Sequence, residues 1–322
     1  MRSSSVLSIS SIALLHVALA GCSGHDDQLG STLPPDASAP ACSDTSAAPV
    51  DIDELHAEPC ELRGLDTAAI AEITAAQDGA LYVLTSAGVV ERFAFGGSGA
   101  CTFTRDASYT APAAHVASIE GSADGRLYAT YLAGTQAVLA WDDGQCSSST
   151  RFRPQIAPAA DGSVVLAPAT ASGLVAVDTA TCTTTPLAFV STETPRVFGR
   201  VGTDVVWGGP SDTGVGRATL AGVDKYRLTD HAFGGRDDAT LEAVGTRIAG
   251  WALGYLFSVD ADTGAQLPAI KYDRFFAASA SREVADEARF DAAPDGHTAY
   301  VLGVAPGTGE CAVRSWLYKL TD

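Results

Sequence analysis

Charged residues recur at fixed distances before a series of tight turns, and these positions offer the most chemistry. Counting back six and four residues from each turn gives a set rich in charged and hydroxyl side chains, and its candidates are Glu72, Arg196, Arg289 and Asp291. Two arginines can hold an anionic group, while a carboxylate can exchange a proton or bind a cation. The same residues can also form a solvated ring of mutually neutralising charges, so both interpretations stay open.

The elements that must position these side chains are marked by a turn that repeats six times. The Asp-Gly pairs are Asp78-Gly79, Asp124-Gly125, Asp161-Gly162 and Asp295-Gly296, and Gly202-Thr203 and Gly245-Thr246 occupy the two remaining places. An Asp-Gly pair between apolar runs predicts a β-hairpin, because glycine readily adopts the positive φ that such turns need. A β-forming run follows each turn, and successive turns are about 43 residues apart on average.

Each repeat carries one candidate strand before the turn and two after it, and in the first three repeats a fourth begins at Cys101, Cys146 and Cys182. Six such units resemble a β-propeller, in which four-stranded blades surround a channel lined by the innermost strands. The sixth repeat ends after its third strand, whereas Cys60 to Gly64 has the character of a fourth strand without a repeat of its own. Pairing the two would close the ring and remove two open edges.

We therefore predict an all-β fold over residues 58–322, a six-bladed β-propeller of four-stranded antiparallel blades closed by the N-terminal strand in the last blade. Helix is expected only around Ser281 to Arg289, between the fifth and sixth blades. A β-sandwich, or two smaller β domains, is the alternative architecture.

The predicted body resembles six-bladed propellers of the NHL and gluconolactonase-like kind in architecture. For the lactonases this resemblance implies a divalent cation held by a Glu on the first inner strand together with Asn and Asp from later blades. Glu72 lies on the expected first inner strand, but the chain contains no asparagine that could supply the amide ligand. Glu72 is therefore the only residue of this ligand set that the resemblance assigns to the chain. The sequence also lacks zinc-like spacings, a complete calcium loop, a phosphate-binding loop and a Gly-x-Ser-x-Gly elbow. We expect no metal and no cofactor.

The N-terminus is similar to a bacterial lipoprotein signal. A mostly apolar run from Val6 to Leu19 follows Met1-Arg2, is too short to span a bilayer permanently, and ends in Leu19-Ala20-Gly21-Cys22. This tetrad resembles the lipobox, which implies cleavage of residues 1–21 and a diacylglycerol on the sulfur of Cys22. The alternative is an ordinary secretory signal in which Cys22 is incidental. Residues 22–57 are rich in Pro, Ser and Ala, carry acidic side chains and contain no Lys or Arg, so we expect a flexible tether.

Six cysteines remain once Cys22 is assigned to the lipid, and an even number in an exported protein suggests disulfides. They are Cys42, Cys60, Cys101, Cys146, Cys182 and Cys311. Four of them lie near the start of outer strands in successive blades. Because neighbouring outer strands splay apart at the rim of a propeller, we expect bridges between them only where the turns approach unusually closely. The pairing stays open.

The charge balance limits the class of partner. The chain has 20 Lys and Arg against 38 Asp and Glu, a net charge of -18, which argues against nucleic acid because phosphate binding needs clustered basic side chains. We expect a lipid-anchored protein of the bacterial cell envelope, at the outer membrane facing the periplasm or the cell surface, whose propeller binds a protein or glycan without catalysis. The alternative is a hydrolase or lactonase-like enzyme with its site in the channel. The oligomeric state is left open.

Overall fold

The computed structural model describes residues 41–96, 101–111, 113–168, 173–187, 197–208, 215–228, 241–308 and 310–322. The expected signal peptide, Cys22 and Arg196 lie outside these ranges. Strands dominate the described residues, and the short helix α1 (Arg282–Asp286) begins after the N-cap Ser281, inside the segment where helix was expected. A single 3-10 turn, η1 (Tyr272–Arg274), precedes it. No helix in these ranges combines the length and apolar character needed to cross a bilayer.

Four sheets consist of four antiparallel strands each, with strands in chain order from one edge to the other. They are β8 (Val116–Gly121), β9 (Leu127–Ala133), β10 (Gln136–Trp141) and β11 (Gly144–Ser148); β12 (Phe152–Pro158), β13 (Ser163–Pro168), β14 (Leu174–Asp178) and β15 (Thr183–Leu187); β16 (Val197–Val201), β17 (Asp204–Gly208), β18 (Val215–Thr219) and β19 (Asp224–Leu228); and β20 (Glu242–Val244), β21 (Arg247–Ala252), β22 (Tyr255–Asp260) and β23 (Ile270–Lys271).

The remaining strands form one ten-stranded sheet that contains two more antiparallel four-strand units. The first is β4 (Ile70–Ala75), β5 (Leu81–Thr85), β6 (Val90–Phe95) and β7 (Thr102–Arg105), and the last is β24 (Arg289–Ala292), β25 (Thr298–Pro306), β26 (Val313–Thr321) and β3 (Leu55–Arg63). Strand β3 is long enough to serve both, because residues 56–60 pair antiparallel with β26 and residues 61–63 pair parallel with β7. Four of the expected blades are therefore separate sheets, whereas the first and last units share one.

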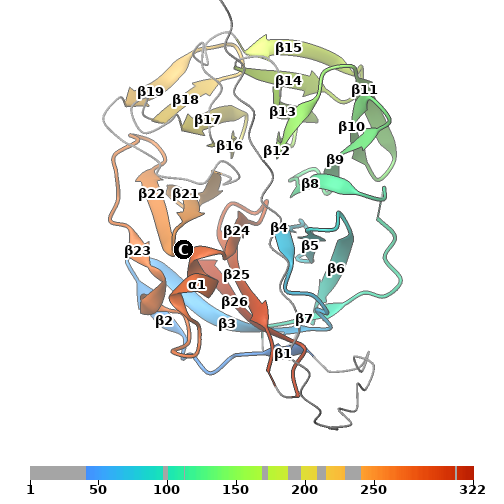
Figure 1. The fold of residues 1–322 in the computed structure, drawn as a ribbon. Coiled ribbons are helices and arrows are strands. Elements are labelled where there is room, and N and C mark those ends of the chain that lie inside the picture. The colour runs from blue at the N-terminus through green and yellow to red at the C-terminus, as the bar shows by residue number, and fades with distance from the viewer. Residues whose placement is uncertain are drawn as a thin grey trace, which may run out of the picture. The chain divides into compact units, whose positions relative to one another are not determined.

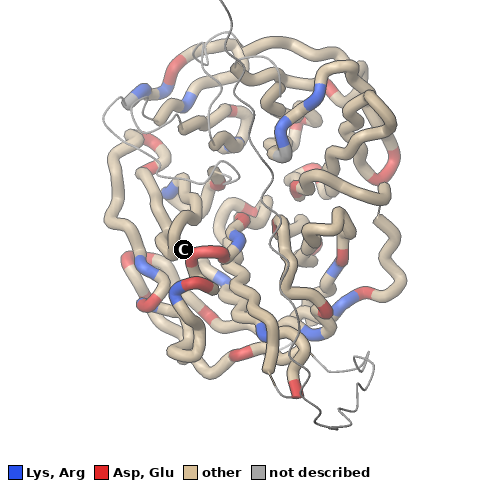
Figure 2. Tube along the Cα trace, viewed as in Figure 1, with Lys and Arg blue, Asp and Glu red and all other residues tan. Residues whose placement is uncertain are grey.

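The first strands of these units form a closed circuit, as a propeller requires (Figure 1). Strand β4 lies against β8, β8 against β12, β12 against β16, β16 against β20, β20 against β24, and β24 against β4. The all-β, propeller-like arrangement is thus confirmed, including closure of the last unit by the N-terminal strand β3. Charged positions of both signs occur all around this circuit of sheets (Figure 2), and many are paired, as Arg92 is with Asp78 and Asp106.

The hydrophobic core is divided among the contacts between neighbouring units. Each of six clusters in the described residues combines side chains from two adjacent units; Leu84 with Ile119 and Phe198 with Val165 are examples. A four-stranded sheet exposes two faces, and packing each face against the next unit buries both. The fold is consequently stabilised as a ring and not as a set of independent sheets.

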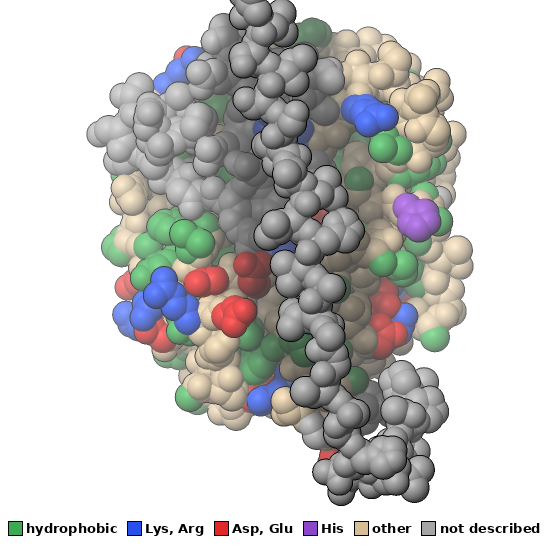
Figure 3. Space-filling model, viewed as in Figure 1, with side chains coloured by type: hydrophobic (Ala, Val, Ile, Leu, Met, Phe, Trp, Pro, Cys, Tyr) green, Lys and Arg blue, Asp and Glu red, His purple; other side chains and the backbone are tan. Residues whose placement is uncertain are grey.

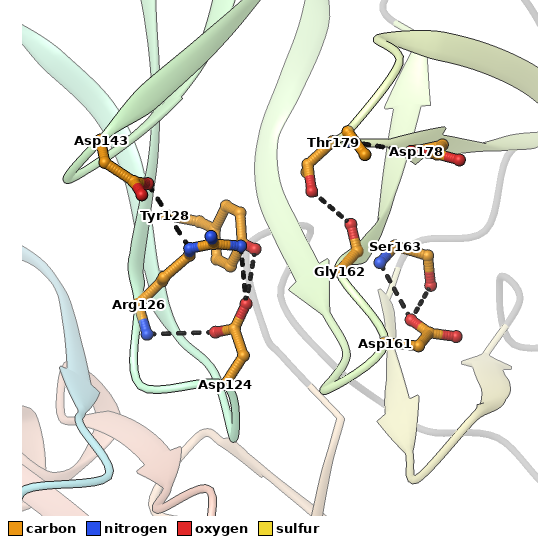
Figure 4. A network of polar contacts seen from close by, with 10 residues as sticks. Asp124, Arg126, Tyr128, Asp143, Asp161, Gly162, Ser163, Asp178 and Thr179 are labelled. Carbon is orange, nitrogen blue, oxygen red and sulfur yellow. Dashed lines mark hydrogen bonds and ion pairs between the residues drawn. The ribbon is translucent and has the colours of Figure 1, made fainter.

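The expected turns connect the first two strands of each unit. The six turn glycines all have positive φ, from 56° at Gly245 to 86° at Gly125. In the Asp-Gly turns the aspartate Oδ1 accepts a hydrogen bond from the backbone N–H two residues later, as Asp124 does from Arg126 and Asp161 from Ser163 (Figure 4). This local side-chain bond gives the turn an internal partner for its backbone and explains why the dipeptide predicts the hairpin.

The N-terminal segment is ordered further upstream than the expected tether allows. Strands β1 (Ala41–Ser43) and β2 (Val50–Ile52) lie within residues 22–57. Strand β1 pairs parallel with residues 313–315 of β26, and Asp44 forms an ion pair with Arg314 at 3.0 Å. A disulfide joins Cys42 to Cys311. The tether boundary at residue 57 is therefore wrong, because contacts with the distant C-terminal strand order a segment whose composition favours a coil.

All six cysteines expected in bridges are paired, as Cys42–Cys311, Cys60–Cys101 and Cys146–Cys182. The expectation that outer strands splay too far apart fails for the last two bridges, whose Cα atoms are 4.6 and 5.4 Å apart. For Cys60–Cys101 the reason is visible in the sheet, since β3 and β7 are hydrogen-bonded to each other. The cysteines thus fasten successive outer strands to one another.

Gly199 on β16 is expected to tolerate no side chain. A Cβ at this position would lie 1.6 Å from the carbonyl oxygen of Leu241, just before the neighbouring inner strand β20. We expect Gly199→Ala to lower the free energy of unfolding by about 3 kcal/mol, because the two strands must separate. Denaturant unfolding checks this, with Gly96→Ala as the control, where the nearest atom is 3.3 Å away. Equal stability of the two variants would contradict the close approach of β16 and Leu241.

Candidate functional site

Polar side chains of the innermost strands fasten each strand to the next one. The Glu72 carboxylate on β4 accepts hydrogen bonds from the Ser118 hydroxyl at 3.0 Å and the Ile119 N–H at 2.7 Å, both on β8. Thr74, on the same strand, accepts from the Gly121 N–H at 2.8 Å. Inner strands have a free edge whose backbone groups need partners, and these side chains supply them.

The junction between the last and first units uses two of the predicted site residues. The Arg289 guanidinium donates to the carbonyl oxygens of Ala71 at 2.6 Å, Ile70 at 3.2 Å and Glu287 at 2.6 Å. The Asp291 Oδ2 accepts from the Ala75 N–H at 2.8 Å. Both residues lie on β24 and bind β4, so they hold the circuit closed.

The four predicted candidates therefore do not converge as an anion clamp in the described part of the chain. Arg196 lies outside it, and the three guanidinium nitrogens of Arg289 bond backbone carbonyls. Glu72 is engaged with β8. These contacts favour the structural interpretation of Glu72 and Arg289 and leave Asp291 as the candidate with a free oxygen.

Asp291 belongs to a cluster of three carboxylates that comes from three different inner strands. One carboxylate oxygen each of Glu120 on β8, Glu242 on β20 and Asp291 on β24 lies within 4.8 Å of the others. Glu120 and Asp291 are buried and Glu242 is partly buried. In the described residues no Lys or Arg forms an ion pair with any of them.

Burial and mutual repulsion shift the acidity of this cluster. Burial raises the pKa of Asp291 to about 7, against the opposing effect of the Ala75 N–H, which stabilises the carboxylate. Burial also raises the pKa of Glu120 well above its usual value, and the charges of Asp291, Glu242 and Glu72 raise it further. The pKa of Glu242 is raised by burial and by Asp291. A carboxyl group with a pKa near neutrality can hold or release a proton, and three carboxylates together suit a hard cation.

Two members of the cluster, Glu120 and Glu242, line a cavity of about 160 Å³ at one end of the inner-strand circuit, and Ala292, the residue after Asp291, lines it as well. Its walls come from the ends of β8, β12, β16, β20 and β24 and the turns that follow them. Arg200 lines it, and burial lowers the pKa of this guanidinium. The Arg200 Nη1 and Nη2 atoms donate to the Ser163 hydroxyl and the Thr203 carbonyl, which holds the side chain against the wall.

Counting back four residues from the turn reaches Glu120 and Asp291, of which only Asp291 is among the predicted candidates, and it misses Glu242. In the first unit five residues, 76–80, connect the paired ends of β4 and β5, whereas two residues, 245–246, connect β20 to β21. With the shorter turn, four residues back is Leu241, which is buried in a hydrophobic cluster. The length of each turn could have identified Glu242, because it changes the number of residues between the turn and the inner-strand position that faces the channel.

Comparison with known proteins supplies no family. No protein-family model matches the chain, and no curated protein matches it. Among solved structures, Hsv2 of Kluyveromyces lactis has 9% sequence identity and a TM-score of 0.45, covering 74% of this chain and 71% of that chain. The crystal structure of BamB from Moraxella catarrhalis has 11% identity and a TM-score of 0.40, covering 85% of this chain and 94% of that chain.

Proposed function

We propose that the protein is an exported bacterial lipoprotein, anchored through Cys22, whose six-unit propeller binds a protein or glycan partner without catalysis. The single observation that carries this proposal is the pairing of the cysteines. Three disulfides use six of the seven cysteines and leave Cys22 alone, in the tetrad that resembles a lipobox. Disulfides persist in oxidising compartments outside the cytosol, which supports export.

The contacts in the inner-strand circuit support a binding role over a catalytic one. Glu72 and Arg289, two of the three described candidates for chemistry, form hydrogen bonds that join neighbouring strands. A closed ring of sheets with connecting loops at its ends is a scaffold on which loops can recognise a partner. We place the body at the cell envelope, at the outer membrane, facing the periplasm or the cell surface.

The described surface favours recognition through mixed polar and apolar contacts. The large exposed hydrophobic side chains, Val89, Phe95, Leu132, Val223 and Leu253, belong to separate strands and turns. On the face shown in Figure 3, hydrophobic side chains form small groups separated by polar and charged ones. A protein or glycan ligand fits such a surface better than an apolar lipid.

Anchoring is tested by the substitution Cys22→Ala. We expect this variant to lose membrane association, because several acyl chains provide the anchor in this account. Membrane and soluble fractions are compared by immunoblotting, with Ser23→Ala as the matched control that leaves the cysteine in place. A Cys22→Ala chain that stays in the membrane fraction would overturn the anchor.

Binding is tested by crosslinking the wild-type chain in intact cells. A discrete crosslinked partner is the expected result.

The second candidate, a channel-sited hydrolase or lactonase, is favoured by the buried carboxylates beside the cavity. Turnover of a lactone or ester by the purified chain, lost in Asp291→Asn and accompanied by no crosslinked partner, would replace the binding module by this enzyme.

A further inference from the structure

We propose that Glu120, Glu242 and Asp291 bind a hard divalent cation, with Ca²⁺ preferred, at the cavity end of the inner-strand circuit. A binding module needs no ion, so this inference goes beyond the proposed function. It also departs from the expectation from sequence that the chain holds no metal site. The argument rests on distances, on unpartnered buried oxygens and on the charge of the site.

The distances fit one coordination sphere. Ca²⁺ binds oxygen at about 2.3–2.6 Å, so two ligands on opposite sides of the ion lie roughly 4.6–5.2 Å apart. The three carboxylate oxygens all lie within 4.8 Å of one another. Three oxygens at this spacing can surround a single ion after small movements of their side chains, with the strands that carry them in place.

Asp291 presents an oxygen that lacks a partner. Its Oδ2 accepts the Ala75 N–H, which fixes the orientation of the carboxylate, whereas Oδ1 meets no donor with hydrogen-bond geometry in the described structure, although the side chains of Thr74 and Glu120 also interact with this carboxyl group. The residue is 0% exposed, so water outside the protein does not reach it. A buried carboxylate oxygen without a donor is unfavourable, and a cation beside it removes that penalty.

A second unpartnered oxygen lies on the wall of the same cavity. The Ser122 hydroxyl is in a residue only 3% exposed, lines the cavity and has no hydrogen-bond partner among the described residues. The Ser122 hydroxyl is neutral and lies outside the carboxylate cluster. A hydroxyl in such a place can form a hydrogen bond with a water that is coordinated to Ca²⁺. The cavity of about 160 Å³ has room for several waters, which would complete the six to eight ligands that Ca²⁺ takes.

The charge of the site also favours a cation. Glu91 is a buried carboxylate elsewhere in the ring and is paired with Arg105, whereas none of the three clustered carboxylates has an ion pair with Lys or Arg in the described chain. Arg200 reaches the cavity, but its Nη1 and Nη2 atoms bond Ser163 and Thr203. A divalent ion would offset two of the three negative charges of the ionised cluster and join β8, β20 and β24, which belong to three different units of the ring.

The test is direct binding of Ca²⁺, Mg²⁺ and Mn²⁺ to the full chain purified in detergent and stripped with chelator. We expect Ca²⁺ to bind at one site per chain by calorimetry and to raise the melting temperature by roughly 5–10 °C at a hundred times Kd. Glu242→Gln and Asp291→Asn should each weaken Ca²⁺ binding at least about tenfold, because each removes one of few charged ligands. Asp204→Asn removes a buried carboxylate that pairs with Arg217 and is not among the residues that line the cavity, and this control should keep the Ca²⁺ response.

Calorimetry on the wild-type chain decides the matter even if a variant fails to fold. No binding of any of the three ions at millimolar concentration would overturn the proposal. Binding that persists unchanged in a folded Asp291→Asn chain would also overturn it, because the ion would then be held elsewhere. Glu242 is only partly buried, so Glu242→Gln is the variant expected to disturb folding least.

Discussion

Replacing both Cys42 and Cys311 by alanine is expected to lower the free energy of unfolding by roughly 5–6 kcal/mol, the largest effect of removing any one of the three disulfides. The bridge closes a loop of 269 residues, so it restricts the unfolded chain more than the others do. It also secures β1 beside β26. Denaturant unfolding under non-reducing conditions measures the change.

The matched control is the double variant Cys146→Ala, Cys182→Ala. That bridge spans 36 residues, and the same chain-entropy estimate gives roughly 4 kcal/mol. The test variant and the control variant each keep the other two disulfides. If removal of Cys42–Cys311 destabilises the protein less than removal of Cys146–Cys182, the longer loop does not give the larger stabilisation, and the prediction is contradicted.

Arg289→Met is expected to lower the free energy of unfolding by about 3 kcal/mol while keeping the length of the side chain. The substitution removes the donors to the carbonyls of Ile70 and Ala71, so backbone acceptors at the junction of β24 and β4 lose their partner. Glu72→Ala should act similarly at the junction of β4 and β8, where the buried Ile119 N–H loses its acceptor. Thermal or denaturant unfolding measures both.

These variants separate the structural role from a catalytic one. Side chains kept for catalysis often reduce stability, so their removal leaves stability unchanged or raises it. Arg63→Ala is the control, since this arginine forms an exposed pair with Glu61 and should change stability by less than about 0.5 kcal/mol. If the Arg289→Met and Glu72→Ala chains are as stable as the Arg63→Ala chain, the hydrogen bonds of Arg289 and Glu72 do not stabilise the contacts between inner strands, and the structural assignment is contradicted.

The local elements of the fold could be predicted because their causes are local. An aspartate that bonds the backbone two residues later and a glycine with positive φ define the hairpins at Asp124-Gly125 and Asp161-Gly162. An N-terminal closing strand followed from counting strands, and residues 56–60 of β3 do pair with β26, but of the predicted segment Cys60 to Gly64 only Cys60 takes part in this pairing. The sharing of β3 with β7 did not follow, because it depends on how far the long strand β3 extends past β26.

The site could be predicted only in part, because its contacts cross between units. Asp291 was identified by its position before a turn, whereas the bond between Arg289 and the carbonyl of Ala71 depends on how closely β24 approaches β4. Glu242 was missed because its turn is two residues long. The pairing of Cys146 with Cys182 likewise depends on the distance between two outer strands, which no local pattern encodes.

The central claim, an exported chain anchored through Cys22 and stapled by disulfides, is tested most directly by mass spectrometry of the protein purified from cell membranes. Peptide mapping without reduction is predicted to find a chain that starts at Cys22 with lipid on its sulfur, and the bridges Cys42–Cys311, Cys60–Cys101 and Cys146–Cys182. A chain that retains residues 1–21, or an N-terminal peptide with an unmodified Cys22 thiol and free thiols elsewhere, would contradict the account.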